Sequence, residues 1–222
     1  MAEEQPLIID YYSDVLCVWA YFSQIKVDQL KADFGDQIEI REHFLSLFGN
    51  NHERIAIGWE DGGYSGYAAF VQEAANHFEH VSLHPDVWLR NQPTSSMPAH
   101  LYVKAVQLLE EKSKSEQSKF AWSVREAFFS ELKDVSNKGV LQELVERTGL
   151  DLNQVENHLE SGLAHAALAI DIAAQKELLI EGSPTFILNN GRQKLYGNIG
   201  YRAIAANVEE LLQRKIDIPA WC

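Results

Sequence analysis

The chain has 222 residues, of which 46% are hydrophobic and 23% charged, as in an ordinary globular protein with a sizeable core. Its formal net charge of −13 opposes binding to phosphate backbones and to anionic membrane surfaces. No apolar run approaches the roughly 20 residues of a membrane helix, and the acidic N-terminus does not fit a signal peptide. We therefore expect a cytoplasmic protein that binds neither nucleic acid nor a membrane.

The N-terminal part predicts a strand, a helix and a second strand. Residues 7–12 are apolar and rich in β-formers, which indicates a buried strand. From Cys17 to about Phe34 the apolar residues have helical spacing. Residues 37–45 then alternate between apolar and polar side chains, as a strand does. Two parallel strands joined by a right-handed crossover are the expected arrangement.

The middle of the chain shows little but helical patterns, after a glycine-rich loop at residues 58–66. Asn137 is expected to cap one helix, and Asp151 with Gln154 suits a capping box at the start of the next. The predicted helices cover residues 67–78, 98–111, 117–132, 137–149, a stretch from 151, and 163–179.

The C-terminal part returns to strands. Residues 184–188 predict an apolar strand, residues 189–191 (Asn-Asn-Gly) a hairpin turn, and residues 193–196 the return strand. A final amphipathic helix is predicted at 201–214.

This order of elements predicts an α/β thioredoxin fold with a large all-helical insertion between its βαβ and ββα halves. We expect residues 1–50 and 180–222 to form a thioredoxin-like domain and residues 51–179 to form a helical insertion domain. The helices should lie over the sheet and leave a cleft near Cys17.

Cys17 is the first candidate for chemistry, because it lies where the first strand runs into the first helix. Helix N-terminal amides and the helix dipole favour a thiolate there, so we expect a lowered pKa. The alternative is a buried structural thiol, since free cysteine is often buried. The other cysteine, Cys222, is the last residue, where a frayed, exposed thiol is the default and a resolving role stays open.

The second candidate feature is Gly182-Ser183-Pro184-Thr185 at the start of a predicted strand. A proline cannot donate to a central ladder, and a cis Ser183–Pro184 bond at a ligand-facing edge would explain it. The backbone of Ser183 could then pair with an extended thiol peptide.

Both features resemble the DsbA-like family, in its FrnE-like and 2-hydroxychromene-2-carboxylate isomerase branches. Residues 13–21 (Ser-Asp-Val-Leu-Cys-Val-Trp-Ala-Tyr) are similar to that family's active-site segment, and residues 182–198 to its cis-proline strand and hairpin. Residues 91–95, 99–100 and 149–151 also resemble it. The resemblance implies that Cys17 is catalytic. It also implies a substrate- or glutathione-binding set of Ser13, Trp19, Ala20, Ser183, Pro184, His100 and Asn198.

The sequence departs from the family pattern at Ala20, where the second redox cysteine would stand, and at Val18, the usual proline. A mixed disulfide on Cys17 must therefore be resolved by an external thiol. Glutathione as co-substrate is implied by resemblance, since the related kappa-class glutathione transferases bind it on this fold with a hydroxyl at the nucleophile position. Partners would be a small-molecule thiol or a thiol peptide, and a homodimer stays open.

The sequence thus predicts a single-cysteine thiol–disulfide oxidoreductase (Cys-x-x-Ala). Two alternatives remain: a glutathione-dependent isomerase or transferase of the kappa-class type, and a non-catalytic binding or chaperone-like module.

Several residues have plainer interpretations. Trp19 suits packing better than a substrate platform, and His100 suits either a cleft wall or a core histidine. His77, His80 and His84 would share one helix face, which we interpret as solvated, so no metal is expected.

Overall fold

The computed structural model describes residues 5–59, 62–109 and 114–213. The elements in chain order are β1 (Leu7–Ser13), α1 (Val18–Phe34), β2 (Ile38–Phe44), α2 (Asn51–Gly58), α3 (Gly63–Ala75), α4 (Met97–Gln107), α5 (Lys114–Phe129), α6 (Lys138–Arg147), α7 (Leu152–Glu160), α8 (Leu163–Glu177), β3 (Thr185–Leu188), β4 (Gln193–Tyr196) and α9 (Tyr201–Gln213). None of the helices within these ranges is both long and apolar enough to cross a membrane.

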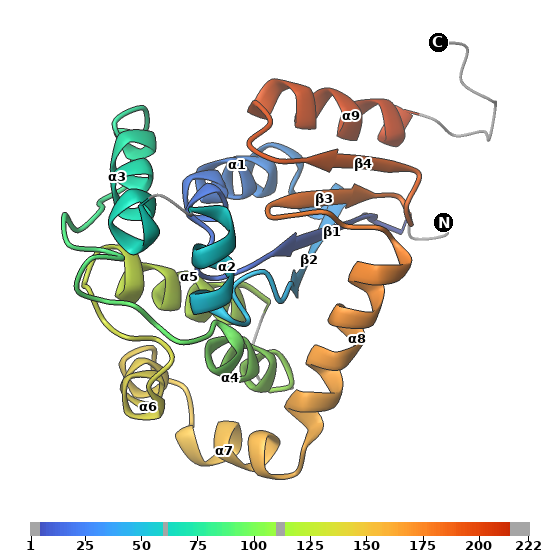
Figure 1. Cartoon of the computed structure of the whole chain (residues 1–222). Coiled ribbons are helices and arrows are strands. Elements are labelled where there is room, and N and C mark those ends of the chain that lie inside the picture. Colours follow the sequence, from blue (N-terminus) through green and yellow to red (C-terminus); the bar gives the residue numbers. More distant parts are fainter. Residues whose placement is uncertain (1–4, 60–61, 110–113, 214–222) are drawn as a thin grey trace.

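One four-stranded sheet joins the two ends of the chain, in the order β2-β1-β3-β4 (Figure 1). Strands β1 and β2 are parallel, and β3 runs antiparallel to both β1 and β4. The hairpin turn between β3 and β4 holds Asn189, Asn190 and Gly191 at φ values of 51°, 54° and 89°. Asparagine and glycine tolerate this left-handed region best, which is why they mark the turn. The predicted βαβ and ββα halves of one sheet are thus confirmed.

Helices cover both faces of the sheet. Val27 and Leu30 of α1 and Ile204 and Val208 of α9 pack on one face, in a cluster that includes Ile9 of β1. On the other face, Tyr12, Leu45, Ile180 and Ile187 form a smaller cluster with the end of α8. Of the remaining helices, α3 stands at the upper left in Figure 1, and α4, α6 and α7 lie in the lower part.

The largest hydrophobic core belongs to the helical part and reaches into the start of α1. Trp88 belongs to this core and has no exposed surface; its ring centroid is 5.5 Å from that of Phe48 and 5.0 Å from that of Phe128. The same cluster includes Cys17 and Phe22. The division of the chain into a thioredoxin-like and a helical domain stays a prediction.

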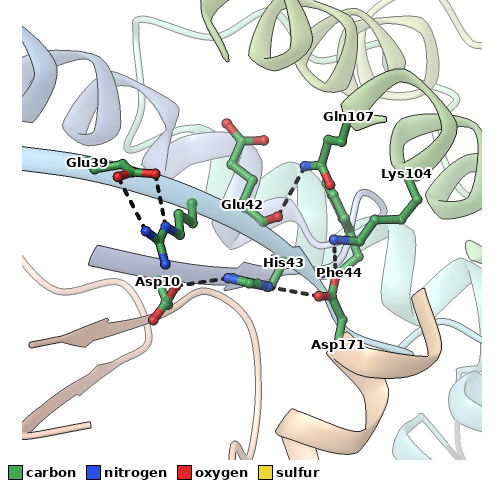
Figure 2. Close-up of polar contacts among 9 residues, drawn as sticks. Asp10, Glu39, Glu42, His43, Phe44, Lys104, Gln107 and Asp171 are labelled. Carbon is green, nitrogen blue, oxygen red and sulfur yellow. Dashed lines mark hydrogen bonds and ion pairs between the residues drawn. The ribbon is translucent and has the colours of Figure 1, made fainter. Parts of the chain in front are cut away.

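A polar network fastens two helices to β2 (Figure 2). Asp171 of α8 accepts from the Phe44 amide at 2.8 Å and pairs with Lys104 Nζ of α4 at 2.6 Å. Its Oδ1 lies 2.8 Å from His43 Nδ1, and the other ring nitrogen of His43 lies 3.0 Å from Asp10 of β1. Asp171 is almost completely buried, so this network replaces the water that its carboxylate gives up.

Two local predictions were wrong. The stretch before residue 67 contains α2, and α3 already begins at Gly63 within the expected loop. Helix α3 ends at Ala75, so His77, His80 and His84 do not share a helix face. The chain leaves the helix where Phe78 stacks on Phe22, with ring centroids 4.3 Å apart, so tertiary packing outweighs the helical pattern. Within the described residues, no group of three His, Cys, Asp or Glu side chains could hold a metal.

Candidate active site

Cys17 is the N-cap residue of α1, at the junction with the loop that follows β1. Its Sγ donates to the carbonyl oxygen of Ser183 at 3.2 Å, across 166 positions of sequence. The Ser183–Pro184 peptide bond is cis. The structure therefore brings together the two features that the sequence analysis singled out, on the first helix and at the start of β3.

The thiol is buried, with only 6% of Cys17 exposed. Burial raises its pKa above the ordinary value, and the charge of the Asp14 carboxylate acts in the same direction. Hydrogen bonds from the Ser183 side chain and from the amides of Ala20 and Trp19 oppose this without reversing it. The expected lowered pKa was therefore wrong. The helix N-terminus supplies amides as predicted, but desolvation of a buried thiolate outweighs them.

Asp14 organises the loop that carries Cys17. Its Oδ1 accepts from the Leu16 amide, and its Oδ2 from the Phe48 amide and the Ser96 hydroxyl, each at 2.9 Å. The Asp14 amide in turn donates to Ser183 Oγ at 3.0 Å. Burial alone would raise the pKa of Asp14, but the nearby His100 and these hydrogen bonds lower it below the ordinary value. A carboxylate thus fixes three separate chain segments around the cysteine.

His100 lies under the same loop and is completely buried. Its Nε2 accepts from the Val15 amide at 3.2 Å and is 3.5 Å from Asp14 Oδ1. Within the described residues its Nδ1 has no hydrogen-bond partner. Of the two interpretations, the core histidine fits this position, because the ring packs beside Phe44 at 5.1 Å and supports the loop from below.

The other predicted residues have different surroundings. Ser13 is buried, and its hydroxyl accepts from Arg125 Nη2 at 2.7 Å. Trp19 packs edge-on against Phe22 at 5.8 Å and against two further rings, and Ala20 is buried. Asn198 is exposed and accepts from Lys26, so its one described contact is with the middle of α1. The structure thus gathers Cys17, Ser183 and Pro184, whereas it places Asn198 beside another part of the helix.

Three participants escaped the sequence analysis. Arg125 of α5 is 99% buried, and its Nε has no partner within the described residues. Its position four residues after Ala121 puts it on the apolar face of that helix, which is a readable signal. Ser96, which donates a hydrogen bond to Asp14, directly precedes helix α4. Serine is common at that position, so the sequence does not mark it as part of a site. Burial raises the pKa of Tyr67, and the charge of a Cys17 thiolate adds to this effect. No local pattern predicts that the two residues belong to the same buried cluster.

Pockets of about 420, 460 and 220 Å³ open elsewhere on the described part of the chain, and Cys17 lines none of these three. The expected cleft over Cys17 is therefore not among them.

Two curated relatives have sequences similar to nearly the whole chain. Both bear the name ClpXP adapter protein SpxH. The protein of Halalkalibacterium halodurans is 26% identical over 95% of this chain, and that of Bacillus subtilis 28% identical over 84%. The chain spans 69% and 60% of the length of these two relatives.

Solved structures share the fold at lower identity. A candidate protein disulfide isomerase from Nitrosomonas europaea matches 95% of this chain and 99% of its own, with a TM-score of 0.77 and 14% identity. The cytosolic disulfide reductase DsbM of Pseudomonas aeruginosa, solved with GSH, matches 92% and 100%, with a TM-score of 0.66 and 18% identity. A 2-hydroxychromene-2-carboxylate isomerase matches 96% and 100%, with the same TM-score and identity.

The sequence also matches the family described as DSBA-like thioredoxin domain over residues 8–209. That range runs from β1 through α9 and includes both Cys17 and the Ser183–Pro184 pair. The chain therefore belongs to the DSBA-like thioredoxin domain family.

Proposed function

We propose that the protein is a thiol–disulfide oxidoreductase that works with Cys17 alone. The observation that carries this proposal is the 3.2 Å contact between Cys17 Sγ and the carbonyl of Ser183, beside Pro184. Ala20 occupies the position from which a second thiol would attack, so the site itself cannot release a mixed disulfide.

The reaction then needs two equivalents of an external thiol. The Cys17 thiolate attacks a substrate disulfide, forms a mixed disulfide with one half and releases the other half as a thiolate. One external thiolate attacks the Cys17 sulfur, so that the substrate leaves reduced and the external thiol stays linked to Cys17. A second external thiolate attacks that linked sulfur and regenerates Cys17. Two external thiols have then lost two electrons and two protons to the substrate, and have become one disulfide.

Glutathione is the external thiol that we propose, in a cytoplasmic setting. Support comes from the fold neighbour DsbM, whose structure was solved with GSH and whose printed name calls it cytosolic. The backbone of Ser183, at the start of β3, is the group that we propose pairs with the peptide-like backbone of glutathione. Pro184 and Trp19 would contact it as neighbours of Cys17.

Mass spectrometry of the reduced protein with oxidised glutathione tests this proposal. The experiment uses a Cys222→Ser background, so that only Cys17 can react. We expect a single glutathione adduct, removal of that adduct by reduced glutathione, and turnover of a small disulfide. Cys17→Ala in the same background should abolish all three. Lack of an adduct, even at a pH well above the thiol pKa, would show that Cys17 is not a working nucleophile.

A second candidate function is that of a binding module, without redox chemistry. Burial of Cys17 and its raised pKa favour this alternative, because both lower the thiolate fraction at neutral pH. The curated relatives that share the name of a ClpXP adapter point in the same direction. The Cys17→Ser variant distinguishes the two functions. An adapter would keep partner binding in this variant, whereas an oxidoreductase would lose turnover. A glutathione-dependent isomerase would keep activity with the serine hydroxyl as donor.

A further inference from the structure

Tyr196, the last residue of β4, lies against the chain segment that leads from α8 into the Cys17 site. A Cβ atom on Gly182 would lie only 2.6 Å from Tyr196 Oη and 2.7 Å from its Cε2. The φ angle of Gly182 is not positive, so the backbone conformation alone does not require glycine there. The missing side chain instead makes room for the tyrosine ring. Since Gly182 directly precedes Ser183, the ring lies beside the backbone of the candidate active site.

Lys194 holds the other end of this segment. It lies two residues before Tyr196 on β4, and side chains at that spacing project from the same face of a strand. Its Nζ donates to the carbonyl of Leu178 at 2.6 Å and to that of Leu179 at 3.0 Å. Carbonyls at a helix C-terminus lack partners within the helix, so this lysine completes the end of α8. Residues 178–182 are therefore held against β4 at both ends.

Leu179 departs from two ordinary preferences of a leucine. Its φ of 50° lies in the left-handed region, which glycine adopts most easily at the end of a helix. Its side chain is 74% exposed, so burial does not offset this strain. Tyr196, at the other end of the segment, is 53% exposed. Two large apolar side chains are thus exposed just before Ser183, and apolar surface gathered beside a site is typical of a ligand contact.

The position of Cys17 determines which part of a substrate would meet this surface. Its Sγ is 3.2 Å from the Ser183 carbonyl, so a substrate cysteine that reacts with it must lie beside Ser183. The Ser183 amide has no hydrogen-bond partner among the described residues and can donate to the backbone of an extended chain. Such a chain advances about 3.3 Å per residue, so the residue next to the substrate cysteine reaches Gly182 and Tyr196.

The charged side chains nearby favour neither sign of occupant. Lys194 is already bonded to two carbonyls, and the exposed Glu181 follows Leu179 by two residues. What remains is the apolar area of Leu179 and Tyr196. It favours an apolar side chain, because both surfaces lose contact with water when they meet.

We propose that Tyr196 and Leu179 select the substrate of the Cys17 site, as a disulfide-bonded polypeptide with an apolar side chain next to the reacting cysteine. This inference rests on the proposed redox function and adds a substrate class to it. Tyr196 would contact the apolar side chain beside the cysteine, and Leu179 a side chain further along the peptide. Glutathione has only glycine and γ-linked glutamate beside its cysteine, so it suits the part of the external thiol and not that of the preferred substrate.

Turnover of two matched peptide disulfides tests this selection, in the Cys222→Ser background with glutathione as external thiol. The peptides are the capped disulfide dimers of Gln-Leu-Cys-Leu-Gln and Gln-Ser-Cys-Ser-Gln. We expect kcat/KM to be about tenfold higher for the leucine peptide, mainly through KM. Tyr196→Ala should reduce this preference to about threefold or less, and Tyr196→Phe should keep it. Ile170→Ala, which removes an exposed apolar side chain in the middle of α8, is the control and should also keep it.

The Leu179→Gly variant distinguishes selection from a structural role. Glycine relieves the left-handed strain, so the urea midpoint of unfolding should rise. The preference for the leucine peptide should fall about threefold or more at the same time. A residue with a structural role alone would not lose selectivity while the protein gains stability. A lower midpoint, or an unchanged preference, would overturn the role of Leu179.

Noncovalent binding keeps this test separate from that of the redox function. Fluorescence anisotropy measures how the same two peptides, with serine in place of cysteine, bind to the wild type and to Tyr196→Ala. If neither disulfide is turned over but the leucine peptide binds the wild type more tightly than Tyr196→Ala, the redox function fails and the selection stands. Equal kcat/KM for the two disulfides, an unchanged preference in Tyr196→Ala or, without turnover, equal binding of the two serine-containing peptides would each overturn the selection.

Discussion

The carboxylate of Asp14 does two opposed things to the cysteine loop. It holds the loop through hydrogen bonds from Leu16, Phe48 and Ser96, and its charge disfavours the thiolate of Cys17. Asp14 therefore orders the loop and at the same time lowers the thiolate fraction of Cys17. A neutral side chain of the same shape would relieve one effect and lose the other.

Replacing Asp14 by Asn should therefore lower stability and, at the same time, lower the pKa of Cys17. The amide nitrogen of Asn cannot accept from Phe48 or Ser96, which costs about 1–3 kcal/mol of unfolding free energy. Removal of the charge eliminates one cause that raises the thiol pKa. Urea denaturation and iodoacetamide labelling against pH measure the two effects. Asp36→Asn, on an exposed residue, is the control and should change neither.

The raised pKa of Cys17 has its own kinetic consequence. In the wild type, the alkylation rate at Cys17 should keep rising with pH beyond the midpoint of a free model thiol, because burial delays ionisation. Labelling the Cys222→Ser protein beside N-acetylcysteine measures this directly. A Cys17 midpoint below that of the model thiol would contradict the structure.

At the scale of single residues, the sequence located Cys17 and the Ser183–Pro184 pair because both stand at element boundaries. It could not give the sign of the thiol pKa, since burial depends on helices that are distant in the chain. The partners of Arg125 and Ser96 could not be predicted for the same reason, although the apolar helix face on which Arg125 lies could be seen in the sequence. Each acts through a contact more than 80 positions away, with Ser13 and Asp14 respectively.

Among the elements, the junction of β2 with α4 and α8 depends on ionised side chains. Burial opposes the charged form of His43, but hydrogen bonds to Asp10 and Asp171 raise its pKa above the ordinary value of 6.5. A group whose pKa is higher in the folded state stabilises that state below its unfolded pKa. This contribution is lost as the pH rises through the folded pKa.

The free energy of unfolding should accordingly decline as the pH rises from about 6.5 through the raised pKa of His43. In His43→Gln this decline should disappear, because glutamine does not titrate. Urea denaturation at a series of pH values measures it. His52→Gln replaces an exposed histidine outside the network and should leave the wild-type decline intact. The same pH profile in both variants would mean that the network does not bind a proton on folding.

The ends of helices show where a local sequence pattern is sufficient to predict the structure. The cap of α6 was predicted because Asn137 accepts from the Gly139 amide two residues ahead, at 2.8 Å, which is a local contact. Helix α2 was missed although Asn50 caps it by accepting from the Glu53 amide. Its eight residues, Asn51–Gly58, are too few for a clear apolar period.

For the whole molecule, the major core crosses the predicted domain boundary. Val15 to Phe22 belong to the same hydrophobic cluster as Phe128 and Leu168 of the helical part. The order of elements predicted one sheet correctly, yet no sequence pattern could show that the helices share their core with the active-site helix. The common core consists of side chains that are far apart in the sequence and come together only in the folded chain.

A cavity in the helical part should therefore weaken the whole protein. Phe128→Ala removes a fully buried ring and should cost about 3 kcal/mol or more of unfolding free energy. We expect the loss to appear equally in tryptophan fluorescence and in hydrogen exchange of the β1 and β3 amides. Exchange in the strands that stays at the wild-type rate would show that the sheet unfolds independently of the helices.

The double role of Ser183 couples ligand occupancy to proton release. Its hydroxyl accepts from the Asp14 amide, while its carbonyl accepts from the Cys17 thiol, so the reduced protein occupies with its own S–H the acceptor that a bound backbone would use. A ligand amide that takes this carbonyl removes the hydrogen bond that holds the proton on sulfur. Any ligand that binds in this way must favour the thiolate, and by thermodynamic reciprocity the thiolate must favour that ligand. Affinity for such a ligand would rise with pH across the titration of Cys17, so the protein would be least reactive when empty and would become a nucleophile as its target arrives.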